Sequence, residues 1–356
     1  MLTVTCLAVA ALSAQTSPPE IQYDSVPDFL KLPTTVYLGV VSDLNLGEVA
    51  GVAVNAQHHL FVFHRGNTTG PAYGAAAAQL LEFGPDGKFI REIGHNLYAR
   101  SYAHAVRIDP QGDIWAVDKG SDMIIRFNPA GRVTMVFGRK KEASDESAVP
   151  WTHVTPPRPA IDGQFRQPTD VTWDPSGNIF ISDGYINSRV AKYDKNGDWV
   201  KQWGDRGTGP GQFNTPHSIA ADARGNIYVA DRGNRRIQVF DPDGSFLRQI
   251  TIDVPIPPNA HPWMGNQPTA QAAAAQNGAP WAICITPGPT QYLFASDAFP
   301  GRIYKLSLDG KVLGVLGSSG RQPKQFGWIH ELACPSEHEI YTAELLNWRV
   351  QKLTLH

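Results

Sequence analysis

Two similar stretches decide the fold: QPTDVTWDPSGNIFISDGYINSRVAKYDKNGDWVKQWG at residues 167–204 and TPHSIAADARGNIYVADRGNRRIQVFDPDGSFLRQI at residues 215–250. Each stretch alternates apolar and polar residues in four short runs, as half-buried strands do. Turn signals separate the runs, such as DPSGN at 174–178 and DPDG at 241–244. Four strands per unit at a period of about forty residues is the pattern of one blade of a β-propeller.

Further copies of this unit account for most of the chain. Clear copies lie at 102–138 and 280–317, and weaker ones at 49–94 and 328–355. The last copy carries only three strands, and we expect Thr35–Val41 to supply its missing outer strand. Such closure by an N-terminal strand would leave no free strand edge. The sequence therefore predicts an all-β, six-bladed β-propeller.

The beginning of the chain resembles an export signal. Residues 1–16 hold a short apolar run followed by small and polar residues, although no positive charge opens the run. We therefore expect a secreted or periplasmic protein with a signal peptide at 1–16, an N-terminal extension at 17–34 and the propeller at 35–356. No later stretch is long and apolar enough to be a transmembrane helix.

Composition and charge exclude several classes of partner. The formal net charge is −2 and like charges do not cluster, so the sequence does not predict the basic surface that binding to nucleic acids requires. We expect a monomer that binds a small-molecule or peptide substrate, and neither nucleic acid nor a membrane. Cys284 and Cys334 lie in the first strands of neighbouring blades, where the sequence leaves a disulfide open and favours buried free thiols.

Histidine recurs at one position of the repeat, the start of the first strand. In blade order the residues there are Ala50, His104, Thr169, His217, Trp281 and His330. One such histidine would usually only form a hydrogen bond, but these three occupy every second blade at equal intervals. First strands line the channel of a propeller, so the three imidazoles would converge on its axis. Three imidazoles with an open fourth position predict a metal site, with zinc favoured over copper or iron.

A second set of equivalent positions follows the second strand of each blade. Five blades have an acid there, which we interpret as a tie between neighbouring blades. Blade 1 instead has His64-Arg65-Gly66, and blade 3 has Tyr185 where several others have glycine. An arginine can bind a carboxylate through two parallel hydrogen bonds. A tyrosine beside a metal or a cation can act as an acid or base, although packing is its commoner role.

Several of these segments resemble known families. GNIYVAD and NRRIQVFD, within 225–241, are similar to the NHL repeat. From about Leu46 onward, the chain resembles the lyase domain of the peptidylglycine α-amidating enzymes. The segments that carry this resemblance are FVFHRG (61–66), QPTDV (167–171), SDGYINSR (182–189), KQWGDRGTGPGQFNTPHSIA (201–220) and ADRGNRRIQVF (230–240). The resemblance implies a six-bladed propeller with zinc on its axis. Its implied reaction splits a peptide with a C-terminal α-hydroxyglycine into a peptide amide and glyoxylate.

The resemblance also implies roles for single residues. The three axial histidines would bind zinc, Tyr185 would be the catalytic base, and Arg65 would bind the substrate carboxylate with Arg232 close by. A nearby structural calcium would be held by the main-chain carbonyls of Val52 and Val106 and by the carboxylate of Glu331. Two departures point to a changed substrate with the metal chemistry kept. The family's Met-Pro-His-Asp is Trp-Ile-His-Glu at 328–331, and Ile186 replaces a family cysteine.

Three functions follow as hypotheses. The first is a zinc-dependent lyase that cleaves the C–N bond of peptidyl-α-hydroxyglycine or of a similar carbinolamide. The second is a metal-dependent propeller hydrolase of the lactonase kind, although such enzymes rely mainly on carboxylate and amide oxygens around calcium. The third is a non-enzymatic NHL propeller that binds protein or glycan, for which three axial histidines would serve no purpose. Metal content and glyoxylate release distinguish the three.

Overall fold

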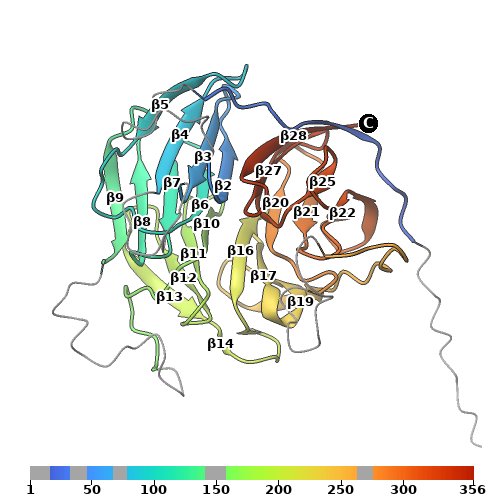
Figure 1. Ribbon diagram of the computed structural model, residues 1–356. Coiled ribbons are helices and arrows are strands. Elements are labelled where there is room, and N and C mark those ends of the chain that lie inside the picture. The colour runs from blue at the N-terminus through green and yellow to red at the C-terminus, as the bar shows by residue number, and fades with distance from the viewer. Residues whose placement is uncertain (1–16, 33–45, 67–77, 141–157, 263–275) are drawn as a thin grey trace, which may run out of the picture.

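A ring of four-stranded antiparallel sheets surrounds a central channel (Figure 1). The computed structural model describes residues 17–32, 46–66, 78–140, 158–262 and 276–356. Those residues form six such sheets, which confirms the predicted six-bladed propeller. Among them there is no helix with the length and apolarity that a membrane span requires.

Each blade runs from an inner strand at the channel to an outer strand at the rim. Blade 1 consists of β2 (Val49–Val54), β3 (Leu60–His64), β4 (Gln79–Phe83) and β5 (Phe89–Ile93). Blade 2 consists of β6 (Ala103–Ile108), β7 (Ile114–Asp118), β8 (Met123–Phe127) and β9 (Val133–Gly138). Blade 3 consists of β10 (Asp170–Trp173), β11 (Ile179–Asp183), β12 (Arg189–Tyr193) and β13 (Trp199–Trp203). Blade 4 consists of β16 (Pro216–Ala221), β17 (Ile227–Asp231), β18 (Arg236–Phe240) and β19 (Phe246–Ile250). Blade 5 consists of β20 (Ala282–Ile285), β21 (Tyr292–Ser296), β22 (Ile303–Ser307) and β23 (Val312–Leu316). Blade 6 consists of β26 (Ile329–Ser336), β27 (Glu339–Glu344), β28 (Arg349–Leu355) and β1 (Tyr23–Val26).

The burial of each strand follows from its place in the blade. All five residues of β3, of β7 and of β17 are buried, because both faces of a middle strand pack against neighbouring blades. The outer strands β9, β13 and β19 are mostly exposed or half-buried. The hydrophobic core therefore lies between the blades, and it holds the inner strands at set places around the channel.

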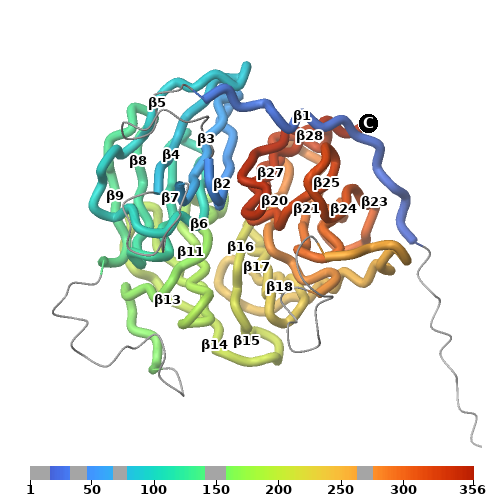
Figure 2. Tube along the Cα trace, viewed as in Figure 1, coloured from blue at the N-terminus to red at the C-terminus, as the bar shows by residue number. Residues whose placement is uncertain are grey.

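An N-terminal strand completes the last blade, as predicted, but it is a different strand. β1 pairs antiparallel with β28, with Tyr23 opposite Leu355, and the two run side by side in Figure 2. The predicted strand at 35–41 lies outside the described residues, and the outer position belongs to residues that were assigned to an extension. That assignment was wrong because the short YDSV of β1 carries a weaker strand signal than the apolar TVYLGVV at 35–41.

Cys284 and Cys334 form a disulfide, so the expectation of two buried thiols was wrong. They lie on β20 and β26, the inner strands of neighbouring blades, with their Cα atoms 6.1 Å apart. Both line a cavity at the far ends of the inner strands. The repeat placed them on neighbouring strands, but the distance between them depends on how the two blades pack.

Candidate metal centre

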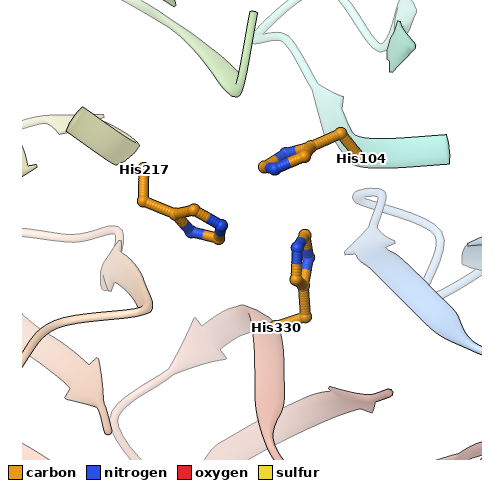
Figure 3. A group of neighbouring side chains, drawn as sticks. All are labelled: His104, His217 and His330. Atoms are coloured by element: carbon orange, nitrogen blue, oxygen red, sulfur yellow. The ribbon is translucent and has the colours of Figure 1, made fainter. Parts of the chain in front are cut away.

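Three histidines meet on the axis of the propeller. His104, His217 and His330 lie near the starts of β6, β16 and β26, the inner strands of blades 2, 4 and 6. Figure 3 shows their rings turned toward one another. Each offers one ligand atom, and these atoms all lie within 4.8 Å of one another. The structure thus brings together the three residues that the repeat register singled out.

Hydrogen bonds between blades orient all three rings in the same way. Each Nδ1 donates to the main-chain carbonyl of the equivalent residue in the next blade: His104 to Thr169 at 2.6 Å, His217 to Trp281 at 2.7 Å and His330 to Ala50 at 2.7 Å. A carbonyl oxygen can only accept, so Nδ1 carries the proton and Nε2 keeps its lone pair. Metal-binding histidines are commonly oriented by such a bond.

The three imidazoles are held neutral. Burial is the main reason that the pKa of each histidine lies well below its ordinary value. Nearby cations lower the pKa further, such as Arg232 for His217 and Arg65 for His330. A metal requires the neutral form of imidazole. The donor set therefore fits zinc, which takes three histidines and an open fourth position in catalytic sites.

Tyr185 lies in the turn that follows β11 of blade 3. Its hydroxyl oxygen is 3.3 Å from Nε2 of His104 and 3.2 Å from Nε2 of His217. These are two of the three nitrogens that the Nδ1 bonds leave free for a metal. The predicted base is thus adjacent to the triad, within reach of a group bound there.

Two arginines lie near the triad, and their donors are used differently. Arg65 donates from Nε to the carbonyl of Ala103 at 2.9 Å and pairs with Glu48 at 2.7 Å. Arg232 begins the short 3-10 helix after β17, and its guanidinium carbon lies 4.1 Å from the ring centroid of Trp281. Its Nε and Nη1 are buried, and no residue in the described ranges accepts a hydrogen bond from them. Arg232 therefore has donors to offer an anionic ligand.

A family profile for the NHL repeat matches residues 213–240, which cover the first three strands of blade 4. Over 228 residues the chain is 31% identical to peptidylglycine alpha-amidating monooxygenase of Rattus norvegicus, a match that covers 57% of this chain and 22% of the rat protein. Over 340 residues it is 24% identical to peptidyl-alpha-hydroxyglycine alpha-amidating lyase 1 of Drosophila melanogaster, covering 87% of this chain and 58% of that one. The chain is a six-bladed propeller with one stretch similar to the NHL repeat, and it resembles the amidating lyases.

Solved structures share the fold of this lyase-like propeller at low identity. A streptogramin B lyase superimposes with a TM-score of 0.55 at 14% identity, covering 94% of this chain and 98% of that one. A gluconolactonase of Xanthomonas campestris gives 0.57 at 14% identity, covering 99% of both chains. At these identities the likeness shows the architecture alone.

Sequence reasoning missed Lys119 as a site residue of the lyase-like propeller. Its Nζ lies 3.9 Å from the ring centroid of Tyr185. Burial, with Arg65 and Arg232 nearby, lowers the pKa of Lys119 to about 8. The repeat did contain a signal, because Arg65, Lys119 and Arg232 each directly follow the second strand of a blade. Together they place positive charge around the triad.

The region around Glu331 does not fit the calcium site that the resemblance implies. Main-chain N–H groups, not carbonyls, meet its carboxylate: those of Val52 at 2.8 Å and Val106 at 3.1 Å donate to Oε2. The guanidinium Nε of Arg107 lies 3.1 Å from the other oxygen, Oε1. Calcium takes about six to eight oxygen ligands. Oε2 of Glu331 is already taken by two amides, and the guanidinium 3.1 Å from Oε1 would repel a cation at that oxygen, so this is not such a site.

Proposed function

We propose that this protein is a zinc-dependent lyase that cleaves the C–N bond of a peptidyl-α-hydroxyglycine, or of a similar carbinolamide, into an amide and glyoxylate. One observation carries the proposal: the Tyr185 hydroxyl lies within 3.3 Å of two of three converging histidine nitrogens. A proton acceptor beside a metal site is what this elimination needs. Relatives named as amidating lyases, of Caenorhabditis elegans and Drosophila melanogaster, support the same reaction.

The residues divide the reaction between them. Zinc, when bound by the three histidines, would supply Lewis acidity at the substrate hydroxyl. Tyr185 accepts the hydroxyl proton while the C–N bond breaks and the C=O bond of glyoxylate forms. It then returns that proton to the leaving nitrogen, so that the amide is released with no net change in protons. Lys119, whose Nζ lies 3.9 Å from the ring centroid of Tyr185, places a positive charge beside this residue.

The carboxylate of the substrate requires a fixed cation to orient the bond that breaks. Arg232 suits this role because two of its buried nitrogens have no acceptor among the described residues. Stacking on Trp281 at 4.1 Å holds its guanidinium in place. Arg65 is already paired with Glu48, so it would assist by its charge more than by new hydrogen bonds. We therefore assign the main carboxylate contact to Arg232.

Replacing Arg232 with methionine is expected to raise the KM for the carboxylate substrate by about 10–100-fold, because a hydrogen-bonded charge is lost. An analogue whose carboxylate is blocked as an amide should react equally slowly with both proteins. Arg235→Met is a matched control, since Arg235 donates to the carbonyl of Asn277. An unchanged KM for the carboxylate substrate in Arg232→Met would refute the assignment.

The reaction itself is tested by incubating purified protein with an α-hydroxyglycine peptide and measuring glyoxylate. We expect release by zinc-loaded protein, loss of release after chelation, and recovery when zinc is restored. Folded protein that contains one zinc per chain and forms no glyoxylate would disprove the lyase proposal. Lactone hydrolysis by that sample would then establish the hydrolase alternative, and no turnover of either substrate would favour a binding protein.

We also propose that the protein is exported. Disulfides persist mainly in oxidising compartments, and the Cys284–Cys334 bond supports such a location. The predicted signal peptide at 1–16 lies outside the described residues. The monomeric state and the exclusion of nucleic acid and membrane as partners stay predictions.

A further inference from the structure

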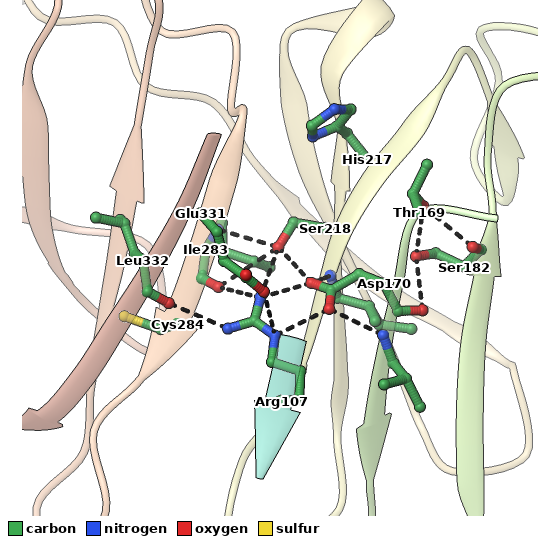
Figure 4. A network of polar contacts seen from close by, with 12 residues as sticks. Arg107, Thr169, Asp170, Ser182, His217, Ser218, Ile283, Cys284, Glu331 and Leu332 are labelled. Carbon is green, nitrogen blue, oxygen red and sulfur yellow. Dashed lines mark hydrogen bonds and ion pairs between the residues drawn. The ribbon is translucent and has the colours of Figure 1, made fainter. Parts of the chain in front are cut away.

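Charged side chains meet inside the channel, deeper than the histidine triad. Arg107 of β6, Asp170 of β10 and Glu331 of β26 converge there, as Figure 4 shows below His217. Asp170 is 1% exposed and Glu331 is 2% exposed. Two carboxylates buried in the same part of the channel need a cation, because an uncompensated buried charge is strongly destabilising.

The guanidinium of Arg107 supplies that cation. Its Nε and Nη2 donate to the two oxygens of Asp170 at 2.9 and 2.5 Å, a parallel two-bond contact. Its Nε also lies 3.1 Å from Oε1 of Glu331. Burial alone would lower the pKa of Arg107, but the charges of Asp170 and Glu331 raise it above its ordinary value. The guanidinium therefore keeps its charge inside the channel.

The contacts of this one side chain connect the whole ring. Besides Asp170 of blade 3, Arg107 donates to the Ser218 hydroxyl of blade 4 at 3.2 Å, the Ile283 carbonyl of blade 5 at 3.4 Å and the Leu332 carbonyl of blade 6 at 3.1 Å. Glu331 extends the network through the amides of Val52 in blade 1 and Val106 in blade 2. All six inner strands thus share one hydrogen-bonded network on the axis.

We propose that Arg107 is an internal cation that links the inner strands at the axis by hydrogen bonds and ion pairs. Its presence there would make this propeller independent of calcium. Three of the four carboxylate oxygens there already accept hydrogen bonds, and the fourth, Oε1 of Glu331, lies 3.1 Å from the Arg107 guanidinium. Both oxygens of Asp170 accept from Arg107, and Oε2 of Glu331 accepts two amides. An arginine fork contacts several acceptors in directions that its planar shape imposes, so it can take the place of an ion with several ligands. This inference does not depend on the reaction proposed above.

The first test uses the full-length, zinc-loaded protein purified without added calcium. We expect less than about 0.1 calcium per chain by elemental analysis, since no oxygen cage is available. We expect the melting temperature to change by less than about 1 °C when 5 mM calcium is added at constant zinc. About one calcium per chain, or a rise of more than about 5 °C with calcium, would overturn the proposal.

The second test removes the cation. Arg107→Met leaves two buried carboxylates uncompensated and is expected to lower the melting temperature by about 5–10 °C. Arg126→Met is the matched control, because Arg126 pairs with Asp113 away from the axis and should shift the melting temperature by about 2 °C or less. If Arg107→Met does not fold, Arg107→Lys provides the measurement, since lysine keeps the charge without the fork. An unshifted melting temperature for the folded variant would overturn the proposal.

Discussion

His217→Ala is expected to abolish the proposed zinc binding and lyase activity while the propeller stays folded. Three imidazoles whose ligand atoms lie within 4.8 Å of one another make the site, and two are too few to hold zinc in a catalytic geometry. Glyoxylate release should fall by at least about 1,000-fold, because the metal's share of transition-state stabilisation amounts to several kcal/mol. Bound zinc should fall from one per chain to a trace.

The control for this loss is a histidine outside the channel. His338 is exposed, and His338→Ala should keep both zinc and activity. Zinc is measured by elemental analysis after gel filtration, and folding by circular dichroism. If His217→Ala retained one zinc per chain and wild-type turnover, the axial triad would not be the catalytic metal site.

Tyr185→Phe is expected to keep zinc and to lower kcat by about 100- to 10,000-fold, which is the usual contribution of a positioned acid or base. Only the hydroxyl is removed, and that hydroxyl lies 3.2 Å from Nε2 of His217. KM should change little, because phenylalanine keeps the ring on which Lys119 lies. The combination of retained zinc and reduced kcat separates this variant from His217→Ala.

Tyr193→Phe in the same blade is the matched control. Tyr193 is 5% exposed and packs against Phe137, between blades and away from the channel. It should keep wild-type kcat, with at most a small loss of stability. A wild-type kcat for Tyr185→Phe, measured with saturating substrate, would show that another group accepts the proton.

The blades could be predicted because their signals are local. β11 and β17 each alternate in a pattern that the next turn ends, and the repeats placed both strands correctly. The convergence of the histidines followed from the same register, since a closed ring turns equal intervals along the chain into equal angles around the axis. The same register drew attention to Tyr185, because blade 3 has a tyrosine at a position where several other blades have glycine.

Other features depend on contacts between residues far apart in the chain. Tyr23 lies opposite Leu355, and a four-residue strand has too little local pattern to show that pairing. The Cys284–Cys334 bond and the Glu48–Arg65 pair depend on distances between neighbouring elements, which the repeat period does not contain. The same holds for the missed Lys119, whose place beside Tyr185 joins two different blades.

The repeats are enough to predict the number of blades, their register and the three residues on the axis, because periodic burial and ring closure act on every repeat alike. Which cation occupies the channel depends instead on contacts between blades. Arg107 is one of two polar residues in β6, and its neighbours in the chain do not show which groups surround it in the fold. Its role appears when Asp170, Glu331 and the carbonyls of other blades surround it, because a buried charge is defined by its partners in space.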